Sequence, residues 1–161
     1  MDYYEIDNDD EEFKEFLDYF DPQDFIREMI ERGQIEKETE YHNDVYELCK
    51  NAVAYMLLKI RDTLFLYQVE VVEGSFKGKH HAWLRAGKYY VDLTLAQFIP
   101  EAPKLVVLHE DTAKKRGYVP EEESDPMEWV VEEEYYPVRD SEALFNPFDE
   151  VSYDEIGDNY I

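Results

Sequence analysis

Three side chains in the middle of the chain have the types that thiol catalysis requires. The sequence contains one cysteine, Cys49, and His81 and Asp92 follow it. A free thiol is mostly protonated at neutral pH, and only the thiolate is a good nucleophile. A histidine beside the sulfur takes up the proton, and a carboxylate beside the histidine orients its ring. Cys49, His81 and Asp92 are therefore a candidate thiol triad.

The segment HHAWLRAGKYYVDL, residues 80–93, predicts a β-hairpin that brings the histidine and the aspartate together. If Arg85 and Lys88 close a two-residue turn, His81 lies directly opposite Asp92, and opposed residues share one face of a sheet. A turn of odd length would shift the register by one residue and separate them. The predicted apolar face is Ala82, Leu84, Tyr89, Val91 and Leu93, and the predicted polar-aromatic face is His81, Trp83, Tyr90 and Asp92.

The cysteine is expected on the most regular helix of the chain, residues 44–60. Asp44 can cap this helix, and Glu47 then completes a capping box. This start places Cys49 in the second turn of the helix. A start nearer Leu48 would place it in the first turn, where the helix dipole favours a thiolate.

The remaining patterns predict an α+β fold, in which N-terminal helices and the cysteine-bearing helix pack on an antiparallel sheet. Spacing of apolar residues and turn signals give the other elements. These are helices at 12–20 and 22–32, a strand at 63–72, a loop at 74–78, a turn or short helix at 94–98, a strand at 105–109, a charged loop at 113–128, and short edge strands at 129–131 and 135–138.

The stretch ELCKNAVAYML, the strand after it, and HHAWLRAGKYYVDLTLAQF resemble the Cys, His and Asp segments of the papain/transglutaminase-like superfamily. They look most similar to small bacterial and phage members that carry His-x-Trp and then Asp-x-Thr and Gln-Phe. The resemblance covers residues 43–98 and implies a papain/transglutaminase-like core with Cys49, His81 and Asp92 as its triad. It also implies that Asn43, six residues before the cysteine, stabilises the oxyanion.

The function that this resemblance implies is cysteine-dependent acyl transfer at a protein or peptide amide. The enzyme would be a protease, an amidase, a glutamine deamidase or a transglutaminase-like enzyme, and it would need no cofactor. We expect a set of aromatic and basic residues around the hairpin to form the rim of the site. These rim residues are Trp83, Tyr90, Lys79, Arg85 and Lys88.

Two other interpretations of the same residues remain open. Cys49 lies on the buried edge of its helix, and a buried cysteine commonly behaves as a small apolar residue. His80, His81 and Asp92 could instead bind a metal, but neighbouring strand residues point to opposite faces, so no metal site is expected.

The charge of the chain is concentrated at its two ends. The net charge is −24, and residues 119–161 hold fifteen acidic residues and one basic residue. We expect a single domain over 1–161, with an acidic arm at 1–12, a core at 13–138 and an acidic tail at 139–161. Residues 140–161 are predicted to dock on a basic rim formed by Lys77, Lys79, Arg85 and Lys88.

The acidic ends also support a competing function, that of a non-catalytic binding protein. Such a protein would be a degenerate member of the fold or a nucleic-acid mimic that engages a basic partner. Direct nucleic-acid binding is not expected, because phosphate contacts need Lys and Arg. The single cysteine excludes an internal disulfide, and the absence of a signal-peptide pattern or a membrane-spanning run predicts a cytoplasmic protein. The oligomeric state cannot be read from these patterns.

Overall fold

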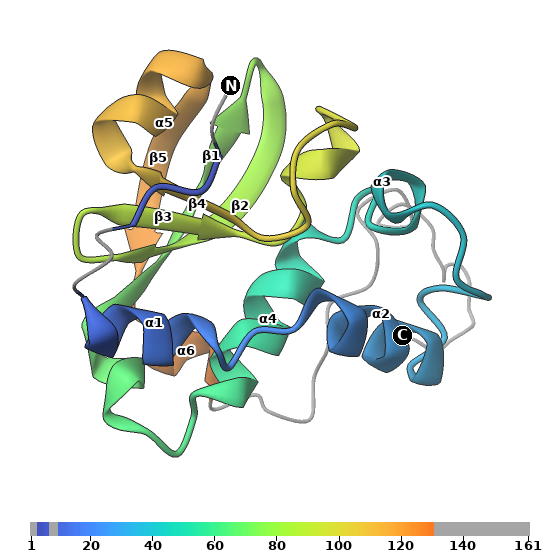
Figure 1. Cartoon of the computed structure of the whole chain (residues 1–161), viewed down its shortest axis with the longest axis horizontal. Coiled ribbons are helices and arrows are strands. Elements are labelled where there is room, and N and C mark those ends of the chain that lie inside the picture. The colour runs from blue at the N-terminus through green and yellow to red at the C-terminus, as the bar shows by residue number, and fades with distance from the viewer. Residues whose placement is uncertain (1–2, 7–9, 131–161) are drawn as a thin grey trace.

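A five-stranded antiparallel sheet, in the order β4-β3-β2-β1-β5, forms the centre of the molecule (Figure 1). The computed structural model describes residues 3–6 and 10–130. The strands are β1 (Val69–Phe76), β2 (Lys79–Ala86), β3 (Tyr89–Asp92), β4 (Val106–His109) and β5 (Tyr118–Ser124). The helices are α1 (Glu11–Leu17), α2 (Pro22–Glu31), α3 (Tyr41–Asp44), α4 (Cys49–Lys59), α5 (Glu110–Arg116) and α6 (Met127–Val130), with 3-10 helices η1 (Leu64–Gln68) and η2 (Leu95–Gln97). The predicted α+β class is confirmed.

Two apolar clusters cover the two faces of the sheet. Side chains alternate between the faces along β2 and β3. Leu84 and Val91 pack with α1, α2 and α4 on one face, whereas Trp83 and Tyr90 pack with α5 on the other. Figure 1 shows α5 on the opposite side of the sheet from α1 and α4. The predicted division of the hairpin into an apolar face and a polar-aromatic face is confirmed.

The register of the hairpin differs from the prediction by two residues. Leu84 lies opposite Val91, so the two-residue turn begins at Gly87 instead of one residue earlier. Gly87 has a φ of 63°, a backbone conformation that glycine adopts at no steric cost and that two-residue hairpin turns require. A shift of two residues leaves each side chain on its predicted face. His81 and Asp92 therefore share a face without being directly opposed.

The predicted helix at 44–60 is wrong in its first turn. Asp44 ends the short helix α3, and its carboxylate accepts hydrogen bonds from Thr39, including one of 2.9 Å from the backbone N–H. Glu47 has a φ of 59°, which an α-helix cannot contain. The expected capping box is therefore absent, and α4 begins at Cys49.

Four further segments differ from their predicted structure. The predicted strand at 63–72 begins with η1, because the Thr63 hydroxyl caps that turn by accepting from the Phe65 N–H at 3.1 Å. Strand β1 starts later and continues into the predicted loop at 74–78. The predicted loop at 113–128 is the end of α5, strand β5 and the start of helix α6, which also contains residues 129 and 130 of the predicted edge strand at 129–131. Residue 131 lies outside the described residues. The predicted edge strand at 135–138 lies outside the described residues.

Part of the predicted acidic arm is attached to the sheet. Tyr4 forms a parallel bridge with Val107 of β4. Val107 accepts a hydrogen bond from the Glu5 N–H at 2.7 Å and donates one to the Tyr3 carbonyl at 2.9 Å. The exposed edge of β4 is thereby paired, which removes an open row of backbone groups.

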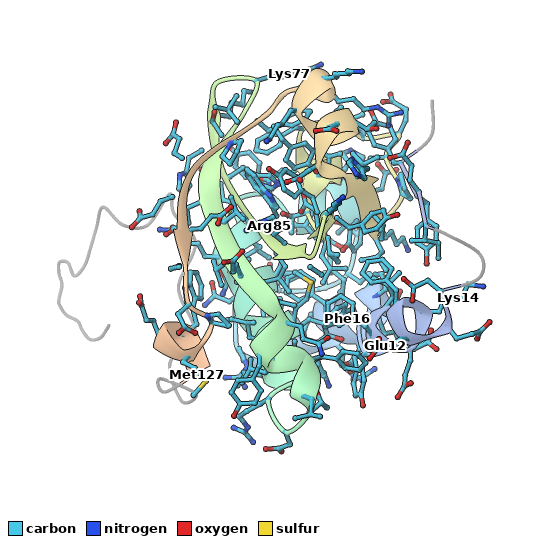
Figure 2. The ribbon with its side chains drawn as sticks, turned by 90° about the vertical axis from the view of Figure 1, so that its left-hand side faces the viewer. Glu12, Lys14, Phe16, Lys77, Arg85 and Met127 are labelled. Carbon is cyan, nitrogen blue, oxygen red and sulfur yellow. The ribbon has the colours of Figure 1, made fainter. Side chains whose placement is uncertain are left out.

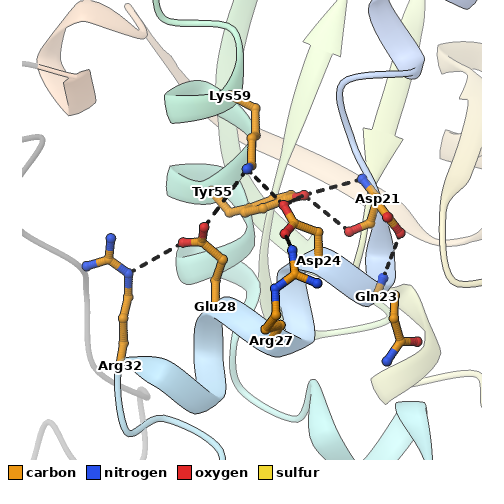
Figure 3. Close-up of polar contacts among 8 residues, drawn as sticks. All are labelled: Asp21, Gln23, Asp24, Arg27, Glu28, Arg32, Tyr55 and Lys59. Atoms are coloured by element: carbon orange, nitrogen blue, oxygen red, sulfur yellow. Dashed lines mark hydrogen bonds and ion pairs between the residues drawn. The ribbon is translucent and has the colours of Figure 1, made fainter.

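A polar cluster joins α2 to the second half of α4 (Figure 3). The Tyr55 hydroxyl donates to Asp24 at 2.9 Å and accepts from the Asp21 N–H at 3.3 Å. Lys59 lies 2.8 Å from Asp24 and 3.9 Å from Glu28. These contacts fix α4 against α2, and so they help to hold the helix that carries Cys49 in place on the sheet.

Candidate active site

His81 and Asp92 form a buried pair on one face of the hairpin. The His81 Nε2 atom lies 2.6 Å from Asp92 Oδ2, and the two side chains are 0% and 1% exposed. His81 stands near the start of β2 and Asp92 is the last residue of β3. Because this contact uses Nε2, the other ring nitrogen, Nδ1, is left for a second partner.

Asp92 is held by more groups than the histidine. Its Oδ2 accepts a hydrogen bond of 2.7 Å from the Tyr118 hydroxyl, and its Oδ1 accepts one of 2.9 Å from the Thr94 N–H. Burial raises the pKa of a carboxyl group. Here His81, Thr94 and Tyr118 outweigh burial and hold the pKa of Asp92 below its usual value. Asp92 is therefore a fixed carboxylate that can orient the His81 ring.

Cys49 is the first residue of α4 and is 2% exposed. Residue Leu48 caps the helix without a side-chain hydrogen bond. The first N–H groups of an α-helix have no acceptor within the helix, and they carry the positive end of its dipole. Of the two positions expected for Cys49, the structure shows the one in the first turn of the helix.

The thiol lies close enough to His81 to affect its ionisation. Burial lowers the pKa of a histidine, but the Asp92 carboxylate and the Cys49 side chain together raise that of His81 from 6.5 to about 9. Nδ1 of His81 is buried, and within the described residues it makes no hydrogen bond of ordinary geometry. The effect of Cys49 on the pKa of His81 shows that the two side chains lie close together in the core.

The raised pKa of His81 predicts a loss of stability in alkali. A group whose pKa is higher in the folded state stabilises the fold fully below its unfolded pKa of 6.5, and this stabilisation is lost as the pH rises through about 9. Between pH 6.5 and pH 9.5, the free energy of unfolding should fall by about 3 kcal/mol less in His81→Gln than in the wild type. Urea unfolding at the two pH values measures this difference. The exposed neighbour gives the control His80→Gln, and equal pH dependence in both variants would contradict the prediction.

Aromatic rings surround His81 on the sheet face that it shares with α5. The centroid of the His81 ring is 5.0 Å from that of Phe98, 5.6 Å from that of Trp83 and 6.1 Å from that of Tyr118. Trp83 and Tyr90 are 0% and 1% exposed, so they belong to the core and not to a rim at the surface. Phe98 is half-buried and covers the histidine from the segment after η2.

The basic residues of the predicted rim are spread along the sheet. Lys79 is near the site, with its Nζ 5.9 Å from the centroid of the Phe98 ring. Arg85 is four residues beyond His81 on β2, about 13 Å along an extended strand, and pairs with Glu123 at 3.0 Å. Lys88 is in the turn at that far end of the hairpin. Figure 2 shows Arg85 near the middle of the sheet, well separated from Lys77. The predicted docking segment, 140–161, lies outside the described residues.

Asn43, the residue expected to stabilise the oxyanion, is exposed on α3. A polar side chain that contacts the turn before α4 is Gln97 of η2, whose Oε1 accepts a hydrogen bond of 2.8 Å from the Glu47 N–H. Tyr118, which donates to Asp92, is the other polar residue of the site that the sequence did not reveal. Gln97 belongs to the quoted TLAQF motif, but its partner is 50 residues away in the chain, and no local pattern identifies it.

Comparisons with protein-family models, with curated proteins and with solved structures found no significant match. In residues 3–6 and 10–130, no group of three His, Cys, Asp or Glu side chains is arranged to hold a metal ion. Every helix of that part of the chain is too short or too polar to cross a lipid bilayer.

Proposed function

We propose that this protein catalyses thiol-dependent acyl transfer at a protein or peptide amide, in a papain/transglutaminase-like arrangement. The Cys49 thiolate attacks the carbonyl carbon, and the carbonyl electron pair moves onto oxygen. When the intermediate collapses, the C–N bond breaks and the His81 imidazolium gives its proton to the departing amine. Water or a second amine then attacks the thioester, His81 takes up its proton, and Cys49 leaves as thiolate. Asp92 keeps the His81 ring oriented throughout.

The observation that carries this proposal is the pairing of His81 through Nε2 with Asp92 at 2.6 Å, with Cys49 at the first position of α4 and near enough to His81 to raise its pKa. Because Thr94 and Tyr118 hold the Asp92 carboxylate in place, it can fix the orientation of the His81 ring, as a catalytic base requires. The same carboxylate favours the protonated ring, which in turn favours a thiolate beside it.

Acylation of the native protein by p-nitrophenyl acetate tests the proposal. We expect about one equivalent of p-nitrophenolate to be released rapidly per chain, with the acetyl group found by mass spectrometry on the peptide that contains Cys49. Cys49→Ser is the matched control, because the chain has no other cysteine. A native protein that releases p-nitrophenolate no faster than Cys49→Ser would refute the proposed function.

The competing function is that of an acidic binding protein that engages a basic partner. It is favoured by the burial of Cys49 at 2% exposure and by three consecutive exposed glutamates in β5, Glu121 to Glu123. Under that function the thiol is part of the core and stays unreactive until the protein unfolds. Absence of acylation together with salt-sensitive binding to a polylysine column would support this second function.

A further inference from the structure

One short segment after β3 contacts both halves of the candidate site. Asp92 binds His81, the Phe98 ring covers it, and Gln97 between them reaches back to the turn before Cys49. The backbone of this segment forms local hydrogen bonds, for example one of 3.1 Å from the Gln97 N–H to the Thr94 carbonyl. The Gln97 side chain therefore provides a polar link between the base side and the nucleophile side of the site.

The two ends of the Gln97 amide have different surroundings. Its Oε1 accepts a hydrogen bond of 2.8 Å from the Glu47 N–H, so the amide orientation is fixed, because a flipped group would bring two N–H donors together. Its Nε2 is buried and has no hydrogen-bond partner in the described residues. A buried N–H without an acceptor costs about 1–3 kcal/mol. Either an ordered water molecule or a ligand atom can supply the missing acceptor.

The position of Glu47 places the Gln97 amide at the turn that precedes Cys49. Glu47 adopts a φ of 59°, an unfavourable conformation for a residue with a side chain, and it lies two residues before Cys49. The hydrogen bond that the Glu47 N–H donates to Gln97 Oε1 holds this turn in place. This turn fixes the start of α4 at Cys49. The N–H of Cys49, as the first of the helix, has no acceptor within α4 and can serve as a second donor.

We propose that Gln97 is the oxyanion-stabilising residue of this site. Its side-chain carbonyl holds the turn before Cys49, and its Nε2 donates to the carbonyl oxygen of the substrate. This inference rests on the proposed thiol chemistry and assigns to Gln97 the role that the sequence suggested for Asn43. Donors of this kind act on the charge that develops in the transition state, and loss of one lowers the rate about 10²- to 10³-fold.

Two reagents separate this catalytic role from a structural one. Acetylation of Cys49 by p-nitrophenyl acetate passes through a tetrahedral oxyanion, whereas alkylation by iodoacetamide displaces iodide at a saturated carbon and forms no oxyanion. Gln97→Glu keeps an acceptor for the Glu47 N–H but loses the donor. We expect the ratio of acetylation rate to alkylation rate to fall about 100-fold in Gln97→Glu and in Gln97→Leu. In the control Asn43→Ala, the ratio should stay within about threefold of the wild-type value.

Each other outcome has a definite meaning. An unchanged ratio in both Gln97 variants, including an equal fall in the two rates, would show a purely structural role and overturn the inference. Trp83→Phe removes another buried N–H that has no partner in the described residues. If the ratio falls for Asn43→Ala or for Trp83→Phe but not for the Gln97 variants, the oxyanion donor is Asn43 or Trp83 and the inference is wrong. A wild-type protein that reacts with neither reagent would instead refute the proposed function, and the inference with it.

Discussion

His81→Ala is expected to slow the alkylation of Cys49 by iodoacetamide at pH 6 by about 100-fold. The reason is the loss of the only imidazole that the structure places beside the sulfur among the described residues. An unassisted thiol with a pKa near 8.5 is about 0.3% ionised at pH 6. A thiol paired with an imidazolium is mostly ionised there, and the lower nucleophilicity of such a thiolate offsets part of the gain.

His80 supplies the matched control for this experiment. It is the neighbouring residue on β2, is exposed, and points to the opposite face of the strand. His80→Ala should alkylate at the wild-type rate. His81→Ala leaves a cavity beside Asp92, so His81→Gln serves as a second variant that can still donate to the carboxylate. Equal rates in wild type, His81→Ala and His81→Gln would show that His81 does not activate the thiol.

Asp92→Asn is expected to have the largest combined effect on stability and reactivity. The carboxylate accepts hydrogen bonds from His81, Thr94 and Tyr118, and it is 1% exposed. An asparagine carries a donor where Oδ2 now accepts from two groups, and it leaves a buried imidazolium without its counter-charge. We expect the free energy of unfolding to fall by about 3–5 kcal/mol. Acetylation of Cys49 should slow at least about 100-fold, since the His81 ring loses its orientation.

Tyr118→Phe separates the two parts of that effect. It removes one hydrogen bond of 2.7 Å to Asp92 but keeps the pair with His81. The cost in unfolding free energy should be about 1–2 kcal/mol, with acetylation of Cys49 slowed by less than about tenfold. If urea unfolding and acetylation give the same values for Asp92→Asn and Tyr118→Phe, the His81–Asp92 contact has no special role.

Local pattern was sufficient to place the base and its orienting acid on one face. The alternation of His81, Trp83, Tyr90 and Asp92 with apolar residues assigned the two faces of the hairpin, and the structure agrees. The register could not be obtained in the same way, because a shift of two residues preserves the alternation. The predicted and the observed register differ only in whether the two-residue turn begins at residue 86 or at residue 87.

The start of the nucleophile's helix could not be predicted from local pattern. The sequence from Asp44 to Glu47 fits a capping box, but the Asp44 carboxylate accepts from Thr39, and Glu47, with a positive φ, donates its backbone N–H to the Gln97 side chain. The contact with Thr39 is local but lies upstream of the predicted helix, whereas the contact with Gln97 comes from 50 residues away and depends on the tertiary structure, which overrides a local helix signal. The predicted strand at 63–72 is wrong over residues 64–68, which form η1, because a short apolar run does not distinguish a strand from a helical turn.

The pH dependence of Cys49 alkylation in the native protein tests the thiolate–imidazolium pair most directly. The chain has a single cysteine, so the label reports one site. We predict a second-order rate constant for iodoacetamide that stays within about threefold from pH 8.5 down to pH 6. A rate constant that falls about tenfold for each pH unit below 8.5 would contradict the pair, as would a thiol that reacts only after the protein is unfolded.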